Sequence, residues 1–588
     1  MTQPPADIAK DKALDDKIRQ YALTNAFAHD GKAQQKVVLS KVLAEMPHYR
    51  QRAKEVSTLA NKIIDEVNSL SISDQKRLIE SRWPELLREK MPKTEERKLD
   101  PLPNLEKYHE IITRFSPNPD CVLHMGSARA IVLSHEYAEM YRGKFFLRFE
   151  DTDPRTKKPV LEFYDSIRED LRWLDCKQDL EFIQSDRLPV YYEYTQKLIA
   201  KGRAYVCTCK PEDFRQRIQS MMACPCRALS VQDNFSRWEK MLDGFFAEGE
   251  AVVRVKTNLN HPNPAVRDWP AMRILDPEKY PHPRVGDKYR VWPLYNLSTG
   301  LDDHLMKVSH IIRGKEHLTN EARQRFMYVH LGWEYPEAIH YGRLKITGTM
   351  LSKSKIKLGV EAGTFKGYDD PRLATFAALR RRGIRPEAIK KMIMDVGTNP
   401  TDITLSWDTL YTYNRRIIDN LASRYSFVSK PILIKIRGVS NPRTASLHLH
   451  PEHPEWGSRK IQINPTNGEV KLLVSFRDRK LFVPNQYVRF MGLFNVRIHG
   501  NKGTELTAVY HSESYEDAKQ VHAPLVNFVL EGSGIPAKVV MPNARIIEGI
   551  AEEACKSLTI DDMVQFERFG FVRIDKGGAP LRAFFSHK

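Results

Sequence analysis

The sequence contains few cysteines and no long apolar segment. Seven cysteines in 588 residues are too few for the disulfide framework of a small secreted protein. No apolar run approaches the roughly 18 residues that a membrane-spanning helix needs. The opening segment, MTQPPADIAKDKALDD, has neither a basic stretch nor an apolar stretch, so it does not read as a secretory signal. We therefore expect a protein of the cytoplasm that does not associate with a membrane.

Two common nucleotide-binding motifs are absent as well. The sequence has neither a Walker A loop nor a GxGxxG fingerprint. What it has in excess is positive charge, since 92 Lys and Arg residues against 74 Asp and Glu residues give a net charge of +18. The excess is spread along the chain and is not confined to a basic tail. Distributed positive charge on a long chain predicts a polyanionic partner such as nucleic acid.

The pattern of apolar residues changes along the chain. Residues 1–105 show helical spacing, and from Ile111 to about Gly397 strand-like runs alternate with helical patterns. Such alternation is typical of a parallel α/β domain. Residues 371–424 read as helices, and beyond Tyr425 short apolar runs are separated by Pro, Gly and Asn. This last region predicts one or two all-β barrels.

The first segment whose residues suit ligand binding or catalysis is RFSPNPDCVLHMGSARA, which begins at Arg114. A strand-like stretch runs into a Pro-rich turn, and a helix is expected to open at His124. A helix N-terminus carries free N–H groups and positive dipole, which suits phosphate. Gly126 would let a nucleotide lie on the backbone, and His124 could donate to phosphate oxygens. Taken alone, however, the pattern is better explained by a core or capping histidine.

A second segment, TMLSKSK, lies about 220 residues later, at 349–355. Lys353 and Lys355 alternate there with Ser352 and Ser354, so a short loop could bring two cations and two hydroxyls onto a polyphosphate. Alone, this segment is better explained as a solvated basic loop.

The two segments together resemble the HIGH and KMSKS signatures of class I aminoacyl-tRNA synthetases. Longer stretches resemble the glutamyl-tRNA synthetase subgroup, in its archaeal and eukaryotic branch, and this resemblance covers about 106–588. Two positions depart from the pattern: Ser127 stands where the signature has His, and Cys121 stands where many relatives have Gly. Ser127 keeps a hydroxyl donor near the nucleotide. The stretches that carry the resemblance are LRFEDTDPR, YRVWPLYNLSTGLDDH, SHIIRGKEHLTNEARQ, YDDPRLATFAALRRRGIRPEAI and LSWDTLYTYNRRIIDN.

The resemblance implies a multidomain α/β plus all-β architecture. A Rossmann-like catalytic domain would be interrupted by an inserted domain that binds the tRNA acceptor stem, and β-barrels would hold the anticodon. The expected boundaries are a helical N-terminal region at 1–105, a catalytic domain at 106–200 and 290–365, the insertion at 201–289, a helical connecting domain at 366–424 and the barrels at 425–588.

The resemblance also implies the reaction. Glutamate would be joined to the α-phosphate of ATP, with Mg²⁺ bound to the phosphates, and the glutamyl group would then pass to tRNA. The catalytic residues implied are His124, Ser127 and Lys353. The ATP-binding residues implied are His124, Gly126, Ser352, Lys353 and Ser354.

Glutamate has two carboxylates and one ammonium group, so its pocket should contain two cations and an anion. From the family's motifs, Arg114 and Arg313 would supply the cations, in the forked geometry that suits carboxylates. Glu150 would take the ammonium group, and Tyr295 would bind the side-chain end of the glutamate. Ser116 is the remaining residue that we expect to bind glutamate.

Simpler structural roles remain open for several acidic and basic positions in these motifs. Arg313 could form a surface ion pair with Glu316. Asp151 and Asp153 could cap the helix that follows them.

The cysteines form a third group, Cys207-x-Cys209 and Cys224-x-Cys226, separated by fourteen residues. Four thiolates suit tetrahedral Zn²⁺, although the CxC spacing is tighter than the usual CxxC. Glutamyl synthetases often carry a cysteine-rich knuckle at this place. Free reduced thiols are the alternative, and disulfides are disfavoured in a reducing compartment. The other cysteines, Cys121, Cys176 and Cys555, show no metal spacing.

Basic and aromatic residues alternate in the C-terminal strands. Arg489, Phe490, Phe494 and Arg497 suit single-stranded RNA, whose bases stack on aromatic rings while its phosphates meet cations. The other explanation is a barrel core of aromatics with solvated charges outside.

The expected partners are L-glutamate and tRNA(Glu), and the sequence leaves open whether tRNA(Gln) is charged too. A glutaminyl-tRNA ligase is the alternative enzyme, and a non-catalytic RNA-binding relative is the alternative outside catalysis. Arg313 in RGKEH favours an acidic substrate, because an arginine facing a neutral amide would be poorly paired. We expect a monomer, with residues 1–105 available for a partner protein or for tRNA.

Overall fold

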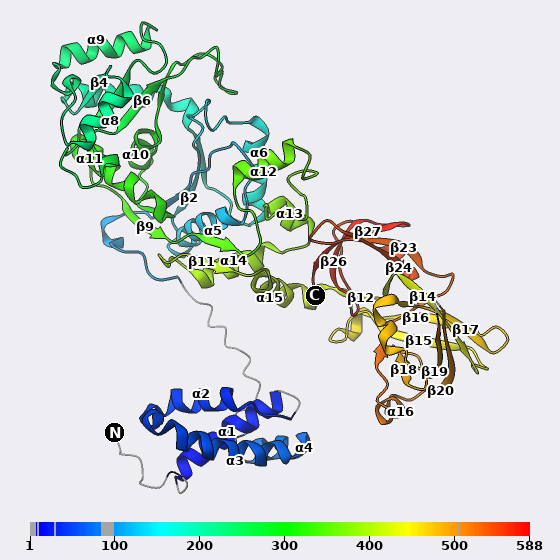
Figure 1. The fold of residues 1–588 in the computed structure, drawn as a ribbon. Coiled ribbons are helices and arrows are strands. Elements are labelled where there is room, and N and C mark those ends of the chain that lie inside the picture. Colours follow the sequence, from blue (N-terminus) through cyan, green and yellow to red (C-terminus); the bar gives the residue numbers. More distant parts are fainter. Residues whose placement is uncertain (1–7, 9–10, 29–30, 84–98, 503–504) are drawn as a thin grey trace. The chain divides into compact units, whose positions relative to one another are not determined.

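The structure, a computed structural model, describes residues 8, 11–28, 31–83, 99–502 and 505–588 (Figure 1). The chain divides into two compact units, Met1–Lys98 and Leu99–Lys588. Among the described residues, none of the helices combines the length and the apolar composition needed to span a membrane.

The first unit is a small bundle of helices. Its α-helices are α1 (Lys12–Ala28), α2 (Gln35–Glu45), α3 (Ala53–Ser69) and α4 (Ile72–Arg82). The buried residues of α3 recur at three- and four-residue spacing, as the helical pattern of this region predicts. Buried Gln75 supports the packing, because its amide donates to the carbonyls of Gly31 and Val67, both at 2.9 Å.

The second unit begins with a parallel sheet. In chain order the elements are β1 (Ile112–Phe115), α5 (Met125–Met140), β2 (Lys144–Phe149), α6 (Leu161–Trp173), β3 (Leu180–Ile183), α7 (Leu188–Ala200), α10 (Tyr295–Leu305), β8 (His310–Gly314), α11 (Leu318–Leu331) and β9 (Glu337–Tyr341). β1, β2 and β3 pair in parallel, and so do β8 and β9. The Ser309 N–H donates to the Ile112 carbonyl at 2.9 Å, which brings β8 to the free edge of β1. The strand order therefore reverses at β1, and the carboxyl ends of β1 and β8 flank the switch point, where open α/β sheets bind ligands.

A four-stranded antiparallel sheet is inserted between α7 and α10. Its elements are β4 (Ala204–Cys207), α8 (Pro211–Gln219), α9 (Val231–Leu242), β5 (Val252–Val255), β6 (Pro270–Ile274) and β7 (Val291–Pro293), with the strands in the order β4-β5-β6-β7. Its core contains the fully buried indoles of Trp238, Trp269 and Trp292. The inserted sheet ends at Pro293, two residues before α10 begins.

Helices connect the parallel sheet to the C-terminal strands. The elements are β10 (Leu344–Ile346), α12 (Lys353–Glu361), α13 (Phe376–Arg381), α14 (Pro386–Val396), β11 (Ile403–Leu405) and α15 (Trp407–Ile418). The helical expectation for 371–424 is wrong at β11, which pairs in parallel with β10. Gly397 and Pro400 break the helical pattern just before it, and the β-branched Ile403 and Thr404 favour an extended backbone.

The C-terminal region consists of two seven-stranded sheets and a hairpin. Its strands are β12 (Ser423–Tyr425), β13 (Phe427–Ser429), β14 (Pro431–Arg437), β15 (Arg443–His448), β16 (Ser458–Ile463), β17 (Glu469–Ser475), β18 (Tyr487–Phe490), β19 (Asn495–Lys502), β20 (Glu505–Ser512), β21 (Leu525–Val526), β22 (Val529–Leu530), β23 (Ile535–Val540), β24 (Ile546–Ala551), β25 (Met563–Phe566), β26 (Gly570–Lys576) and β27 (Leu581–His587), with α16 (Tyr515–Gln520) between β20 and β21.

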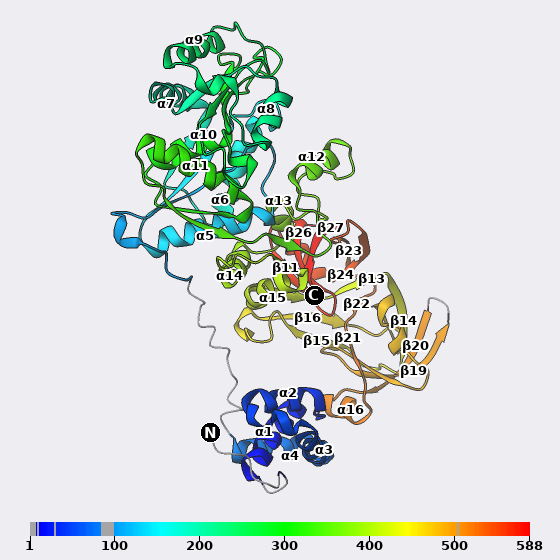
Figure 2. The same cartoon turned by 60° about the vertical axis from the view of Figure 1, so that its left-hand side comes forward.

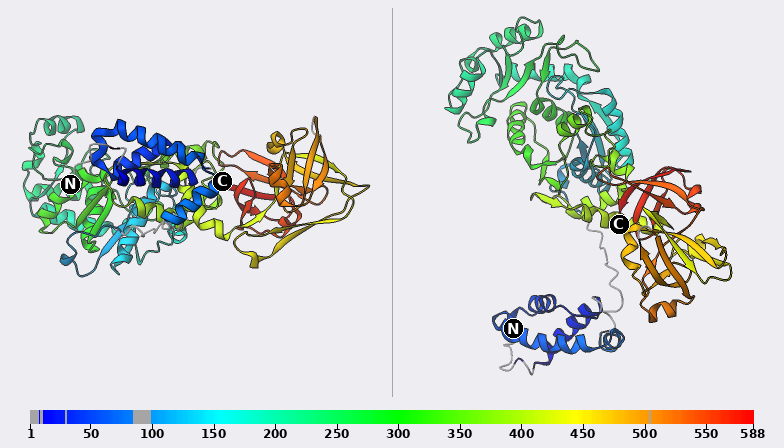
Figure 3. Two further views of the ribbon diagram at one scale, coloured as in Figure 1. Left: turned by 90° about the horizontal axis from the view of Figure 1, so that it is seen from below. Right: turned by 45° about the vertical axis from the view of Figure 1, so that its right-hand side comes forward.

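Each of these sheets closes on itself. One runs β12-β25-β26-β27-β23-β24-β13, and its two edge strands are neighbours in the chain, separated only by Ser426. The other runs β21-β18-β19-β20-β14-β17-β22, and its edges are again neighbours in the chain. The strands curve accordingly in the yellow-to-red part of Figure 3. Joining the edges in this way makes each sheet barrel-like, which confirms the all-β prediction and the fold class as a whole.

The aromatic residues singled out in these strands belong to the barrel core. Phe490 and Phe494 are fully buried. Arg489 donates to the Asn495 side chain and the Glu513 carbonyl, both at 2.9 Å. These two rings are therefore not available for base stacking, and the core explanation is the right one for them.

Candidate active site

His124 and Gly126 form a tight unit at the start of α5. His124 is the N-cap residue, and its Nδ1 accepts the Gly126 N–H at 2.9 Å. A Cβ on residue 126 would lie 2.6 Å from the His124 ring carbon, so glycine is needed there for the ring itself to fit. With Nδ1 accepting, the neutral ring carries its proton on Nε2 and can donate from that side.

Burial and, to a smaller extent, the positive charge of Lys353 lower the pKa of His124 to about 4. The neutral ring therefore stabilises the folded state at pH values above the usual histidine pKa. This contribution is lost as the pH falls through about 4. We expect an NMR titration of ring-labelled protein, assigned with His124→Gln, to show a His124 midpoint near 4. A midpoint near 6.5 would contradict the buried, neutral ring.

Lys353 lies beside the loop that leads to His124. It is the first residue of α12, and its Nζ is 3.2 Å from the Asn118 carbonyl and 3.5 Å from the Asp120 carboxylate. Ser352 and Ser354 bond to each other through their hydroxyls at 3.2 Å. Ser127 lies in the first turn of α5, half-buried. The fold therefore brings the two segments that are predicted to bind phosphate together across more than 220 residues of chain.

Arg114, at the carboxyl end of β1, belongs to a buried ion network. Its Nε and Nη2 donate to the two carboxylate oxygens of Asp303, at 3.0 and 3.3 Å. Arg148, at the end of β2, donates to the same carboxylate at 2.8 Å and to Glu150 at 3.1 Å. Burial alone would raise the pKa of Asp303, but the charges of Arg114 and Arg148 lower it to about 2. Asp303 is thus an anion that holds both arginines.

Glu150 and Tyr295 face this network. Glu150 accepts from Arg148 and, at 2.9 Å, from the Thr299 hydroxyl. Burial raises its pKa, and the nearby charges of Arg148 and Arg114 only partly offset this. Burial and the charge of Glu150 raise the pKa of Tyr295 to about 12, so its hydroxyl stays protonated, 3.2 Å from His317 Nδ1.

Arg313, at the end of β8, is buried among neutral groups. Its guanidinium donates to the Tyr335 hydroxyl at 2.9 Å and to Gln324 at 3.2 Å. Within the described part of the chain no carboxylate lies within 4 Å of it. The alternative of a surface pair with Glu316 is wrong, because Glu316 instead lies 3.8 Å from Arg343. Arg313 is a buried cation that a substrate anion could neutralise.

Neither acidic neighbour of Glu150 caps α6. Asp151 is fully buried and accepts from the Tyr164 hydroxyl at 2.6 Å and from the backbone and hydroxyl of Ser185. Asp153 accepts the Thr156 N–H at 2.9 Å in a turn. Asp151 therefore bonds the segment after β2 to α6 and to the turn that follows β3, and the capping alternative is wrong.

The predicted residues fall into two adjoining groups joined by one loop. The nucleotide group comprises His124, Gly126, Ser127, Ser352, Lys353 and Ser354, and the amino-acid group comprises Arg114, Ser116, Glu150, Tyr295 and Arg313. The loop after β1 touches both, since the Pro117 carbonyl accepts the Glu150 N–H at 2.9 Å and the Asn118 carbonyl accepts Lys353. The Ser116 hydroxyl, in the same loop, is buried without a hydrogen-bond partner among the described residues.

Sequence reasoning missed Arg148, Asp303 and His317. All three stand in the stretches that carry the family resemblance, but nothing in their spacing marks them as charges that meet in the fold. The contact between Arg114 and Asp303 spans 189 residues.

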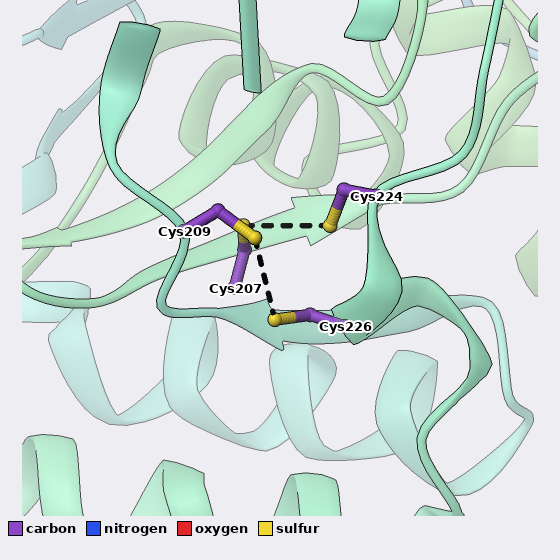
Figure 4. Close-up of side chains that lie close together, drawn as sticks. All are labelled: Cys207, Cys209, Cys224 and Cys226. Carbon is purple, nitrogen blue, oxygen red and sulfur yellow. Dashed lines mark hydrogen bonds between the residues drawn. The ribbon is translucent and has the colours of Figure 1, made fainter. Parts of the chain in front are cut away.

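The four cysteines of the insertion converge (Figure 4). The Sγ atoms of Cys207 and Cys224 are 3.7 Å apart, as are those of Cys209 and Cys226, and all four lie within 4.8 Å of one another. Sulfurs in a tetrahedral site with Zn–S bonds of about 2.3 Å lie about 3.8 Å apart. Arg237 donates to the Cys226 sulfur at 3.3 Å. The donor set and its spacing fit a zinc ion.

Three sequence families match the chain in succession. Their descriptions are the catalytic domain of class I tRNA synthetases (E and Q), over residues 110–420, and two anticodon-binding domains of the same enzymes, over 422–512 and 525–575. The parallel sheet and the C-terminal barrels are thus those of a class I aminoacyl-tRNA synthetase. Within that class, the chain belongs to the family specific for glutamate and glutamine.

Relatives named glutamate–tRNA ligase match almost the whole chain. The glutamate–tRNA ligase of Thermococcus kodakarensis is 50% identical over 573 residues, which are 97% of this chain and 99% of the relative. That of Thermococcus onnurineus is 48% identical over 577 residues, 98% of this chain and 100% of the relative. A crystal structure of a glutamate tRNA ligase from Elizabethkingia meningosepticum with its amino acid matches 54% of this chain and 70% of that chain, at 20% identity and a TM-score of 0.40. The relatives agree with the archaeal-type resemblance found in the sequence.

Proposed function

We propose that this chain ligates L-glutamate to tRNA in two steps. In the first, a glutamate carboxylate attacks the α-phosphate of ATP, the bond to the β-phosphate breaks, and pyrophosphate leaves. In the second, a terminal ribose hydroxyl of tRNA attacks the activated carbonyl, and AMP leaves. Both steps depend on positioning and charge stabilisation and need no covalent enzyme nucleophile.

The observation that carries the choice of substrate is Arg313. Arg114 and Arg148 already pair with carboxylates, both with Asp303 and Arg148 also with Glu150, whereas Arg313 is buried with neutral partners only. Glutamate would place a carboxylate where this cation needs one, while glutamine would offer a neutral amide and leave the charge poorly compensated. The glutaminyl alternative is therefore disfavoured. Tyr295, Ser116 and Glu150 would orient the substrate's remaining groups.

Binding of ATP is assigned to the first turn of α5 and to α12. The positive end of the α5 dipole would attract the phosphates, and the Nε2–H of His124 would donate to a phosphate oxygen. Lys353 would stabilise the charge that develops as pyrophosphate leaves, supported by Ser127, Ser352 and Ser354, while the Gly126 backbone leaves room for the nucleotide. Mg²⁺ would bind mainly through phosphate oxygens and water.

Each remaining region has a proposed place in tRNA recognition. The insertion, placed at 201–289 by the sequence, would meet the acceptor end, and the connecting helices at 366–424 would carry the barrels at 425–588 to the anticodon. We propose that the enzyme acts as a monomer in the cytoplasm, with residues 1–105 as an accessory for tRNA or a partner protein.

Charging of unfractionated tRNA tests the function directly. The protein, ATP and Mg²⁺ are mixed with labelled glutamate or labelled glutamine, with tRNA present from the start. We expect glutamate to be incorporated and glutamine not. Separating the charged tRNA species then decides between tRNA(Glu) alone and tRNA(Glu) with tRNA(Gln). Incorporation of glutamine would support the glutaminyl alternative, and incorporation of neither would support a non-catalytic relative.

We further propose that the four cysteines bind one structural zinc ion. Protein purified without chelators and analysed by atomic emission should contain about one zinc per chain. Cys224→Ser should reduce the zinc content several-fold and lower the melting temperature, because metal binding contributes to folding. Cys555→Ser, which alters a buried cysteine far from this group in the sequence, should retain the zinc. A wild-type chain that binds no zinc, even when zinc is added, would contradict the proposal.

A further inference from the structure

Three uncharged groups hold the guanidinium of Arg313. Its Nη1 donates to Gln324 Oε1 at 3.2 Å, and its Nη2 donates to the Tyr335 hydroxyl at 2.9 Å. Its Nε donates to His340 Nε2 at 3.4 Å. Each nitrogen of the guanidinium is thus positioned by a hydrogen bond, and none of these bonds supplies a negative charge.

Tyr335 and His340 are kept neutral by their surroundings. Burial raises the pKa of the Tyr335 hydroxyl, and the charge of Arg313 only partly offsets this. Burial and the charge of Arg313 lower the pKa of His340, against a smaller opposing effect of Glu321. The His340 ring therefore accepts from Arg313 through an unprotonated Nε2.

The neutrality of Gln324 is set by the residue type alone. Its side chain is fully buried, and Oε1 accepts from Arg313 and, at 2.7 Å, from the Tyr335 hydroxyl. Its Nε2 forms no hydrogen bond within the described part of the chain. The acceptor half of this carboxamide is therefore fully used, and the donor half contributes no hydrogen bond.

A carboxylate at this position would keep the same contacts. Glutamate has the shape of glutamine, and its oxygens would still accept from both donors. It would also supply a counter-ion to a buried cation, which stabilises a folded protein. The glutamine therefore leaves Arg313 uncompensated at a cost in stability, which is typical of positions that serve function.

The helix that carries Gln324 is fixed relative to the amino-acid group. α11 packs against α10, which begins with Tyr295 (Figure 2). Met327 of α11 belongs to the same buried cluster as Leu297 and Leu301 of α10. A charge placed at position 324 would therefore stay beside Arg313.

We propose that Gln324 is a positioning residue that decides between glutamate and glutamine, because its neutral carboxamide orients Arg313 and leaves the charge to the substrate carboxylate. The proposal rests on the function proposed above. It predicts that one added charge, in Gln324→Glu, reverses the preference of the pocket. Arg313 would then be neutralised by the protein, so glutamate would find no uncompensated cation, and the amide of glutamine would no longer leave one unpaired.

The test compares the full-length wild type with Gln324→Glu. Pyrophosphate exchange with tRNA present gives kcat/KM for glutamate and for glutamine, and thermal unfolding without substrates gives Tm. We expect the ratio of kcat/KM for glutamate to kcat/KM for glutamine to fall by about 10²-fold or more, mainly through the KM for glutamate. The KM for ATP should change by less than about threefold, since ATP does not contact Arg313 in the proposed site. The Tm should rise, because the new carboxylate compensates the buried cation.

Two variants control for charge and for packing. Arg325→Gln changes the charge by the same one unit on the next residue of α11, but the Arg325 side chain is 53% exposed and pairs with Glu321 at 2.7 Å. This variant should keep the wild-type ratio. Gln324→Met removes the acceptor and stays neutral, so it should bind glutamate more weakly and still prefer it to glutamine.

Three results would overturn the proposal. One is an unchanged ratio in a folded Gln324→Glu protein. Another is an equal loss for both amino acids with a lower Tm, which would make Gln324 a packing residue. The third is the same fall of the ratio in Arg325→Gln. Should Gln324→Glu fail to fold, His340→Glu, which brings a carboxylate to the Nε side of Arg313 from β9, decides by the same ratio. None of these results concerns the wild type, whereas failure of the wild type to charge tRNA with glutamate would refute the proposed function itself.

Discussion

Lys353→Ala is expected to lower the rate of glutamate activation by about 10²- to 10³-fold, the usual effect of removing one group that stabilises transition-state charge. The Lys353 ammonium lies against the loop before His124, 3.2 Å from the Asn118 carbonyl. Its charge also contributes to the low pKa of His124, which places the two groups in one electrostatic environment. Exchange of labelled pyrophosphate into ATP, measured with tRNA and glutamate present, reports this step.

The control for this substitution is Lys355→Ala. Lys355 is two residues further along α12 and is exposed. A general loss of positive charge from the segment would affect both variants alike, whereas a specific role for Lys353 leaves Lys355→Ala within about threefold of the wild type. If Lys353→Ala retained nearly full exchange activity, the lysine would have no part in activation.

Arg313→Gln is expected to raise the KM for glutamate by about 10²-fold or more, with little change in the KM for ATP. Removing one partner of a buried ion pair costs about 3–5 kcal/mol, because the remaining charge is left uncompensated. In the variant, that remaining charge would be the glutamate carboxylate. Pyrophosphate exchange at varied glutamate and at varied ATP separates the two effects.

Arg343→Gln provides the comparison for Arg313. Arg343 follows β9, its side chain is 60% exposed, and it lies 3.8 Å from Glu316. An exposed pair of this kind contributes little, so this variant should bind glutamate normally. Equal losses for glutamate and ATP in Arg313→Gln would show that the residue supports the whole site and does not select the substrate.

Local sequence patterns predicted most of the fold, including the backbone of the segment around His124. The strand before the Pro-rich turn is β1, and the helix expected at His124 begins at Met125 with His124 as its cap. Both depend on apolar periodicity and capping chemistry within a few residues. The strand β11 was missed because three residues are too few to show a period of two.

The pairing of charges in the site could not be predicted from spacing. Arg114 and Arg313 look alike in the sequence, as arginines at the ends of apolar strands. In the fold Asp303 neutralises Arg114, while Arg313 meets only neutral partners. The same limit applies to Phe490, whose place in the core depends on the strands around it.

The sequence by itself determined the class of the protein, its order of elements and the identity of most candidate site residues, because these depend on local backbone preference and on motifs a few residues long. The tertiary structure alone decided which charges are paired, how each barrel closes and how the four cysteines converge. These features depend on contacts between residues far apart in the chain. Such contacts exist only once the topology has brought their strands and helices together.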